Sequence, residues 1–221
     1  MRHRLSTPAA CLSGLLLLSG CSGLATLAEV ATPSELYMLS PKSTFGANLP
    51  RLTQQIVVEE PTATAAVSTD RIMVQPSPLR VQYFPDVRWV DRAPVIVQTL
   101  LIESYENSGK VAAVGRSTVS LRADYLIVTD IREFHARVMS PDEPKTSPLE
   151  VQVRLNMKVI DASFDRIIAS RSFEEFMVSQ SDEIDDVIEA FDEALGKAMR
   201  DLVEWSVREI SAHARRPDPE G

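Results

Sequence analysis

Cysteine is almost absent from this sequence: its 221 residues include only Cys11 and Cys21, so the chain beyond residue 21 has none. That part of the protein can form no internal disulfide and offers no thiolate for catalysis or metal binding. Histidine is scarce as well, and neither His135 nor His213 belongs to a cluster with metal-ligand spacing. The sequence also lacks a glycine-rich phosphate loop and a G-x-S-x-G nucleophile elbow. We therefore expect no metal, no cofactor and no enzymatic activity.

Positive charge is in deficit. The chain has 23 lysines and arginines against 31 acidic residues, which gives a net charge of -8. Loss of Arg2 and Arg4 with residues 1–20 would lower the net charge to -10. An acidic protein does not hold a phosphate backbone by electrostatics, so we expect no nucleic-acid partner. Anionic lipid would also repel the chain unless a covalent anchor held it at the membrane.

The apolar run near the N-terminus, Leu15 to Leu18, is too short to cross a bilayer as a helix. It follows a basic start and ends in Leu18-Ser19-Gly20-Cys21, which is typical of a secretory signal peptide. The cysteine directly after Leu-Ser-Gly makes this segment similar to a lipobox, in which the thiol is acylated and the chain is cut just before it. We predict that residues 1–20 are removed and that Cys21 is lipidated.

Several acyl chains on one cysteine would hold the protein firmly, because each buried methylene contributes about 0.8 kcal/mol. In lipoproteins of this class an aspartate after the cysteine usually retains the protein in the inner membrane. This chain has Ser22 there. We therefore expect the periplasmic face of the outer membrane of a Gram-negative bacterium. Residues 21–35 would form a lipidated tether, because they are mostly small and polar.

Hydrophobic periodicity predicts two long helices. The first spans Asp91–Asn107, with Asp91 as N-cap and Gly109 as the left-handed C-cap. The second starts at Ile184 and ends near Ile210, because its apolar residues recur every three or four positions. We expect residues 211–221 to be a disordered tail.

Short apolar or alternating segments predict strands, and Thr62–Ser68 is predicted to form a short turn of helix. The predicted strands are Leu36–Leu39, Ile56–Val58, Arg71–Val74, Leu79–Phe84, Val111–Val114, Tyr125–Phe134, Val151–Val159 and Ile167–Val178.

The strand Val151–Val159 indicates the architecture. Its apolar residues alternate strictly with polar ones, so one face of the sheet is buried and the other is solvated. Two amphipathic helices need apolar surface to cover. We predict an α/β fold, a two-layer sandwich with a mixed, largely antiparallel sheet and both long helices on one face. A single domain would span residues 36–210.

The segment Asp70–Trp89 is rich in arginine, aromatic residues and proline. Arginine, tyrosine and tryptophan dominate binding hot spots, so we select Arg80, Tyr83, Phe84 and Trp89 as candidate partner-binding residues. The alternative is that Tyr83 and Trp89 fasten the first long helix to the sheet. For Trp89 this structural role is favoured over partner binding. For Tyr83 and Phe84 the structural role and partner binding are equally favoured.

The same segment resembles the ABC-type transport auxiliary lipoproteins. The resemblance rests on Asp-Arg-Ile, Pro-Ser-Pro, Tyr-Phe-Pro and Arg-Trp within Asp70–Trp89, together with the lipobox, Leu36–Leu39 and the two helices. It extends from about Leu36 to Ile210. It implies a non-enzymatic component of a lipid transport system built on mammalian-cell-entry (MCE) domain proteins and powered by an ABC transporter. One departure from the family's pattern is the proline-rich, acidic loop Ser140–Pro148.

Three functions remain open at this stage. The leading hypothesis is a docking lipoprotein that holds a bridging MCE-domain protein at the outer membrane. The second is a carrier that binds lipid in a cleft between the helices and the sheet, and the third is an activator of a cell-wall enzyme. The short tether argues against the third. A homo-oligomer would suit a tubular partner, but no residue pattern demands one.

Overall fold

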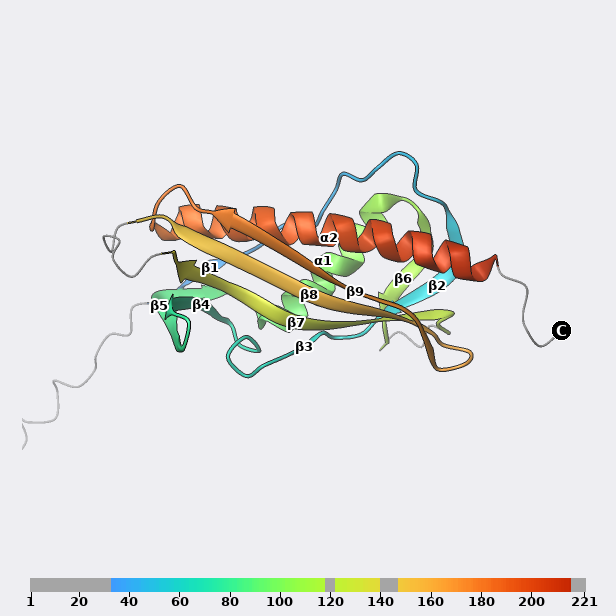
Figure 1. Cartoon of the computed structure of the whole chain (residues 1–221), viewed down its shortest axis with the longest axis horizontal. Coiled ribbons are helices and arrows are strands. Elements are labelled where there is room, and N and C mark those ends of the chain that lie inside the picture. The colour runs from blue at the N-terminus through green and yellow to red at the C-terminus, as the bar shows by residue number, and fades with distance from the viewer. Residues whose placement is uncertain (1–32, 118–121, 140–146, 216–221) are drawn as a thin grey trace, which may run out of the picture. The chain divides into compact units, whose positions relative to one another are not determined.

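The structure, a computed structural model, describes residues 33–117, 122–139 and 147–215 (Figure 1). The predicted signal peptide, the predicted lipidation site Cys21 and the predicted tether up to residue 32 lie outside these residues, as does most of the loop Ser140–Pro148. The described residues from Ser34 onward belong to one compact unit.

Nine strands and two helices follow one another along the chain. In order they are β1 (Glu35–Tyr37), β2 (Leu52–Val58), β3 (Thr62–Ala63), β4 (Arg71–Ser77), β5 (Arg80–Trp89), α1 (Ala93–Ser108), β6 (Val111–Arg116), β7 (Tyr125–Val138), β8 (Leu149–Asp161), β9 (Arg166–Val178) and α2 (Ile184–Ala214).

Strand β7 organises the sheet. Along one edge it pairs with β8 in an antiparallel ladder, and β8 pairs in turn with β9. Along its other edge β7 pairs in succession with three shorter strands, β2, β3 and β4, all of them parallel to it. β6 extends the sheet beyond β2, while β5 and β1 extend it beyond β4. The long β7-β8-β9 meander is therefore antiparallel, and the other half of the sheet is mixed.

The predicted two-layer sandwich is confirmed. Helix α2 lies across β8 and β9, and α1 packs beside it over β2 and β6 (Figure 1). In β8 every second residue from Leu149 to Asp161 is buried, so the alternation seen in the sequence does mark the face that the helices cover. Buried Tyr105 of α1 and Ser206 of α2 join the helices, with 2.6 Å between their hydroxyl oxygens.

Two predicted helix boundaries were wrong. Helix α1 begins at Ala93, with Arg92 rather than Asp91 at the N-cap position and no side-chain cap. The Asp91 carboxylate accepts a hydrogen bond from the adjacent Arg92 N–H at 2.6 Å, so it does not serve the first helical turn. At the other end Gly109 has φ 61° and its N–H donates to a carbonyl of the last turn, as predicted.

The second helix is longer than predicted and continues to Ala214. Residues 211–214 are therefore helical, although the sequence suggested a disordered tail from 211 onward. A tertiary contact explains the extension: the His213 Nδ1 atom lies 2.9 Å from the hydroxyl of Tyr125 at the start of β7. The predicted turn at Thr62–Ser68 is confirmed only in its second part: Thr62 and Ala63 form strand β3, and the N–H groups of Val67 and Ser68 then donate to the Thr64 carbonyl in a single turn.

Candidate docking surface

The candidate residues Arg80, Tyr83 and Phe84 all lie on the hairpin formed by β4 and β5. In the register of the hairpin, Met73 pairs with Tyr83 and Arg71 pairs with Arg88. Between these two pairs β5 advances by five positions, whereas β4 advances by only two. This bulge contains Pro85, which has no N–H to donate to a ladder, and Asp86, whose φ of 57° is left-handed. Regular pairing therefore ends at Tyr83, and Phe84 is the first residue without a partner in β4.

Tyr83 is held from two sides. The guanidinium carbon of Arg71 lies 3.7 Å from the centre of the Tyr83 ring, which is close stacking of a cation on an aromatic face. The Tyr83 hydroxyl donates a hydrogen bond to the carbonyl of Ala66 at 3.1 Å. The ring remains partly exposed. Tyr83 thus offers a fixed, pre-oriented aromatic surface rather than a freely rotating side chain.

A hollow of about 270 Å³ lies beside the bulge, lined by Tyr83, Phe84 and Arg88 among others. Arg88 donates to both oxygens of Asp70 at 3.1 Å, and its Nε atom lies 3.4 Å from the hydroxyl of Ser34. Because Ser34 is the second described residue, the hollow lies where the chain enters the folded unit.

The entry point itself is tied to α2. The Tyr37 hydroxyl donates to the Asp185 carboxylate at 2.7 Å. That hydrogen bond, reinforced by burial and by the charges of Asp185 and Glu35, raises the pKa of Tyr37 to about 12. Tyr37 therefore stays protonated at neutral pH and keeps donating. Strand β1 is consequently fixed to the start of α2.

The tip of the hairpin is exposed and apolar. Leu79 is fully exposed (100%), Val81 is 43% exposed, and Arg80 between them is also exposed. A second hollow, of about 470 Å³, lies where Pro76 and Pro78 meet the ends of β7 and β8, next to Met139. The lining of this hollow is mixed, because Gln75, Arg137 and Glu150 lie beside the prolines and Met139.

Trp89 does not belong to this surface, because it is only 2% exposed. Its ring lies 5.3 Å from that of Phe191 in α2, edge-on, and 5.7 Å from that of Phe134 in β7. Trp89 therefore has the structural role that was favoured for it, because it packs a helix against the sheet. That helix is α2, however, and not α1 as predicted.

His135 is a residue whose position the sequence did not reveal. It is 2% exposed, and neither ring nitrogen makes a hydrogen bond in the described structure. Its Nδ1 atom lies 3.4 Å from Glu133, outside good hydrogen-bond geometry. Burial lowers the pKa of His135, and Arg137 lowers it further, while Glu133 opposes the shift. The imidazole is thus neutral at pH 7.

The described residues offer neither a metal-binding cluster nor a membrane-spanning helix. No group of three or more His, Cys, Asp or Glu side chains has a metal-binding arrangement in residues 33–117, 122–139 and 147–215. Neither of the two helices in these ranges is long and apolar enough to cross a membrane.

Comparison with known proteins adds an independent line of evidence. A protein family described as the ABC-type transport auxiliary lipoprotein component matches residues 37–203. An uncharacterized protein of Bradyrhizobium diazoefficiens is 30% identical over 176 residues, which are 77% of this chain and 44% of that protein. The chain thus spans less than half the length of this curated relative.

Solved structures share the fold. A crystal structure of a Xanthomonas campestris protein, 26% identical, superposes with a TM-score of 0.75 and covers 82% of this chain and 99% of its own. A crystal structure of an uncharacterized protein, only 14% identical, has a TM-score of 0.58 and covers 81% of this chain and 99% of its own. The second likeness concerns the fold alone.

Proposed function

The chain belongs to the family of ABC-type transport auxiliary lipoprotein components, and from this premise we propose that it docks an MCE-domain protein at the outer membrane. Membership of a lipoprotein family implies attachment to a membrane of the cell envelope. The family is a class of transport accessories, not of enzymes. In this proposal Cys21 carries the acyl anchor on the periplasmic face, and the folded domain holds the end of the bridging protein.

The observation that carries the proposal is the exposed β4–β5 hairpin. A fully exposed Leu79, an adjacent Arg80 and a pre-oriented Tyr83 lie on one short element. Tyrosine and arginine are enriched in binding hot spots, and Leu79 adds exposed apolar surface beside them. Leu79 and Val81 both expose apolar surface at this tip, and a partner that covered them would remove that surface from water.

The packing between helices and sheet supports docking over lipid carriage. Buried apolar residues of both helices and of the sheet form one contiguous core in that space. The segment between β1 and β2 runs along the helices, because the Ser40 N–H donates to Asp192 at 2.6 Å and the Gly46 N–H to Glu204 at 2.7 Å. A lipid chain entering there would have to displace packed side chains, which is costly.

A hollow of about 550 Å³ does lie between α2 and the segment that joins β1 to β2. Its lining includes Lys42, Lys197 and Arg200 as well as Glu189 and Asp192. Charged walls of both signs do not suit an acyl chain, which needs apolar surroundings. The hollow therefore gives no support to the carrier hypothesis.

Site-specific photo-crosslinking in cells tests the proposal. A photoreactive residue would replace Leu79 in the lipidated protein, and captured proteins would be identified by mass spectrometry. Phe164, 58% exposed in the turn between β8 and β9, is the matched control position. We expect an MCE-domain protein to be captured from position 79 and not from position 164. Capture should be lost when Cys21→Ala removes the anchor.

A second pair of variants makes the test quantitative. Leu79→Asp should weaken capture at least tenfold, since it places a charge in the centre of the proposed contact, whereas Phe164→Asp should leave capture unchanged. Both positions are exposed, so neither change should affect folding. Equal capture from both positions, or capture of a cell-wall synthase instead, would refute docking through the hairpin.

A further inference from the structure

Strand β9 forms a long edge of the sheet. It runs for 13 residues, from Arg166 to Val178, and within the described parts of the chain it pairs only with β8. Its second edge therefore presents unpaired backbone N–H and C=O groups, which are a template for another strand. Proteins commonly protect such edges with proline or with charged side chains. β9 has no proline, and its charges are of both signs, so a partner strand that carries the complementary charges can add to this edge.

The two faces of β9 differ in how their charges are satisfied. On the solvent face Glu174 accepts a hydrogen bond from Gln152 at 2.7 Å and lies 3.7 Å from Arg154. On the face toward α2, Arg171 and Glu175 flank Phe173, two residues away on either side, and neither takes part in an ion pair within the described structure. Arg171 instead lies near the Phe173 ring, with its guanidinium carbon 5.2 Å from the ring centre.

We propose that the β9 edge pairs with the β9 edge of a second copy of this chain, antiparallel and with Phe173 opposite Phe173. In an antiparallel ladder, residues directly opposite each other point to the same face. This register therefore sets Arg171 of each copy opposite Glu175 of the other, twice by symmetry. It gives each of these two charges an opposite charge, which neither has within residues 33–117, 122–139 and 147–215, and it joins two sheets with their helices on the same side.

Neighbouring registers are less favourable, which makes the match specific. A two-fold axis at Ser172 would set Arg171 opposite Phe173 and Glu175 opposite Ala169. An axis at Arg171 or at Glu174 would set like charges directly opposite each other, which is destabilising. With the axis at Phe173, Ala169 faces Met177 and Ser170 faces Phe176. Of the registers compared, only the one centred on Phe173 sets opposite charges directly opposite each other.

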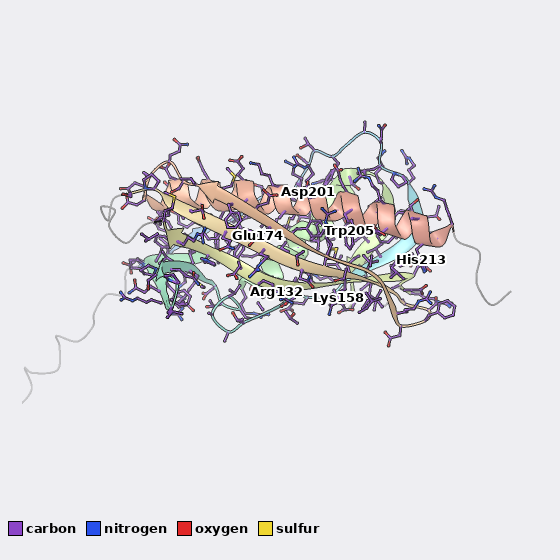
Figure 2. All side chains as sticks on the ribbon, viewed as in Figure 1. Arg132, Lys158, Glu174, Asp201, Trp205 and His213 are labelled. Carbon is purple, nitrogen blue, oxygen red and sulfur yellow. The ribbon has the colours of Figure 1, made fainter. Side chains whose placement is uncertain are left out.

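Helix α2 lies on the same side and supports the centre of the proposed contact. The Trp205 ring lies 5.5 Å from the Phe173 ring, edge-on, so Phe173 is held in place before any partner arrives. Figure 2 shows Trp205 on α2 and Glu174 on β9. Because the hairpin β4–β5 extends the opposite side of the sheet, self-association through β9 leaves the proposed docking surface free. The inference therefore does not depend on the proposed function.

Reciprocal charge reversal tests the interface in the full lipidated chain, purified in detergent. Arg171→Glu alone, or Glu175→Arg alone, places like charges opposite each other twice, and each variant should associate at least tenfold more weakly than the unmodified protein. A mixture of the two variants restores two complementary pairs, so it should form mixed dimers with near-normal affinity. Lys158→Glu is the control, because this exposed side chain lies on β8, one strand in from the edge.

Sedimentation at a series of protein concentrations gives the association constants, and differently tagged copies reveal mixed dimers. The expected result is a dimer for the unmodified chain and the control, weak association for each single variant, and rescue in the mixture. A monomeric unmodified chain, single variants that associate normally, or a mixture without rescue would each overturn the proposal.

Discussion

Replacing Trp89 with alanine should destabilise the fold strongly without touching the proposed docking surface. The indole is 2% exposed and contacts the rings of both Phe134 and Phe191, which are themselves 5.1 Å apart. Removing it leaves a cavity at the junction of three elements, β5, β7 and α2. A Trp→Ala change in a core costs about 3–5 kcal/mol, because lost burial and an unfilled cavity add together.

That cost is a large share of the stability of an ordinary domain, which is about 5–15 kcal/mol. At roughly 2–4 °C per kcal/mol for a domain of this size, the thermal midpoint should fall by about 6–20 °C. Urea unfolding should be followed by far-UV circular dichroism, because removal of one of the two tryptophans changes the fluorescence signal itself.

Leu79→Ala is the matched control for this experiment. Its side chain is fully exposed, so its removal should change the free energy of unfolding by no more than about 0.5 kcal/mol. If Trp89→Ala and Leu79→Ala unfolded within about 1 kcal/mol of each other, the core assignment of Trp89 would be wrong, and the residue would return to the candidate binding surface.

Two further predictions concern buried polar groups. Tyr105→Phe should cost about 1 kcal/mol of unfolding free energy, because it removes the hydroxyl that lies 2.6 Å from Ser206; a Tyr105→Phe/Ser206→Ala double-mutant cycle by urea unfolding should show non-additivity, and simple additivity would argue against the bond. His135 should make the fold sensitive to acid: its pKa is lowered in the folded protein, so the unfolded chain binds more protons as the pH falls below about 6.5, and the stability present above that pH is lost. His135→Phe should therefore lose less stability than the parent between pH 7 and pH 5, and an unchanged pH dependence of the urea midpoint would contradict this.

Much of the fold could be predicted because its signals are local. The alternation in β8 and the apolar stripe of α2 each depend on residues a few positions apart, and the burial of both elements follows them. The end of α2 could not be predicted in the same way. Its last turn depends on the contact between His213 and Tyr125, two residues 88 positions apart in the chain.

The candidate site shows the same division. Tyr83 and Trp89 are both odd-numbered residues of one strand, so simple alternation would put them on one face. The bulge at Pro85-Asp86 changes the parity, because Tyr83 and Arg88 pair with Met73 and Arg71 on the same face of β4. Trp89, next to Arg88, then points the other way, into the core. Composition alone selected all of these residues, and only the register separates the buried one from the exposed ones.

The sequence by itself determined the family and the fold class: the motifs within Asp70–Trp89 and the two amphipathic helices over an alternating sheet are all properties of neighbouring residues. Only the tertiary structure decided which side chains a partner could reach and which strand edge is unpaired. These properties depend on strand order, bulges and helix contacts between distant segments. No short stretch of sequence encodes them, because each is a relation between elements and not a property of one.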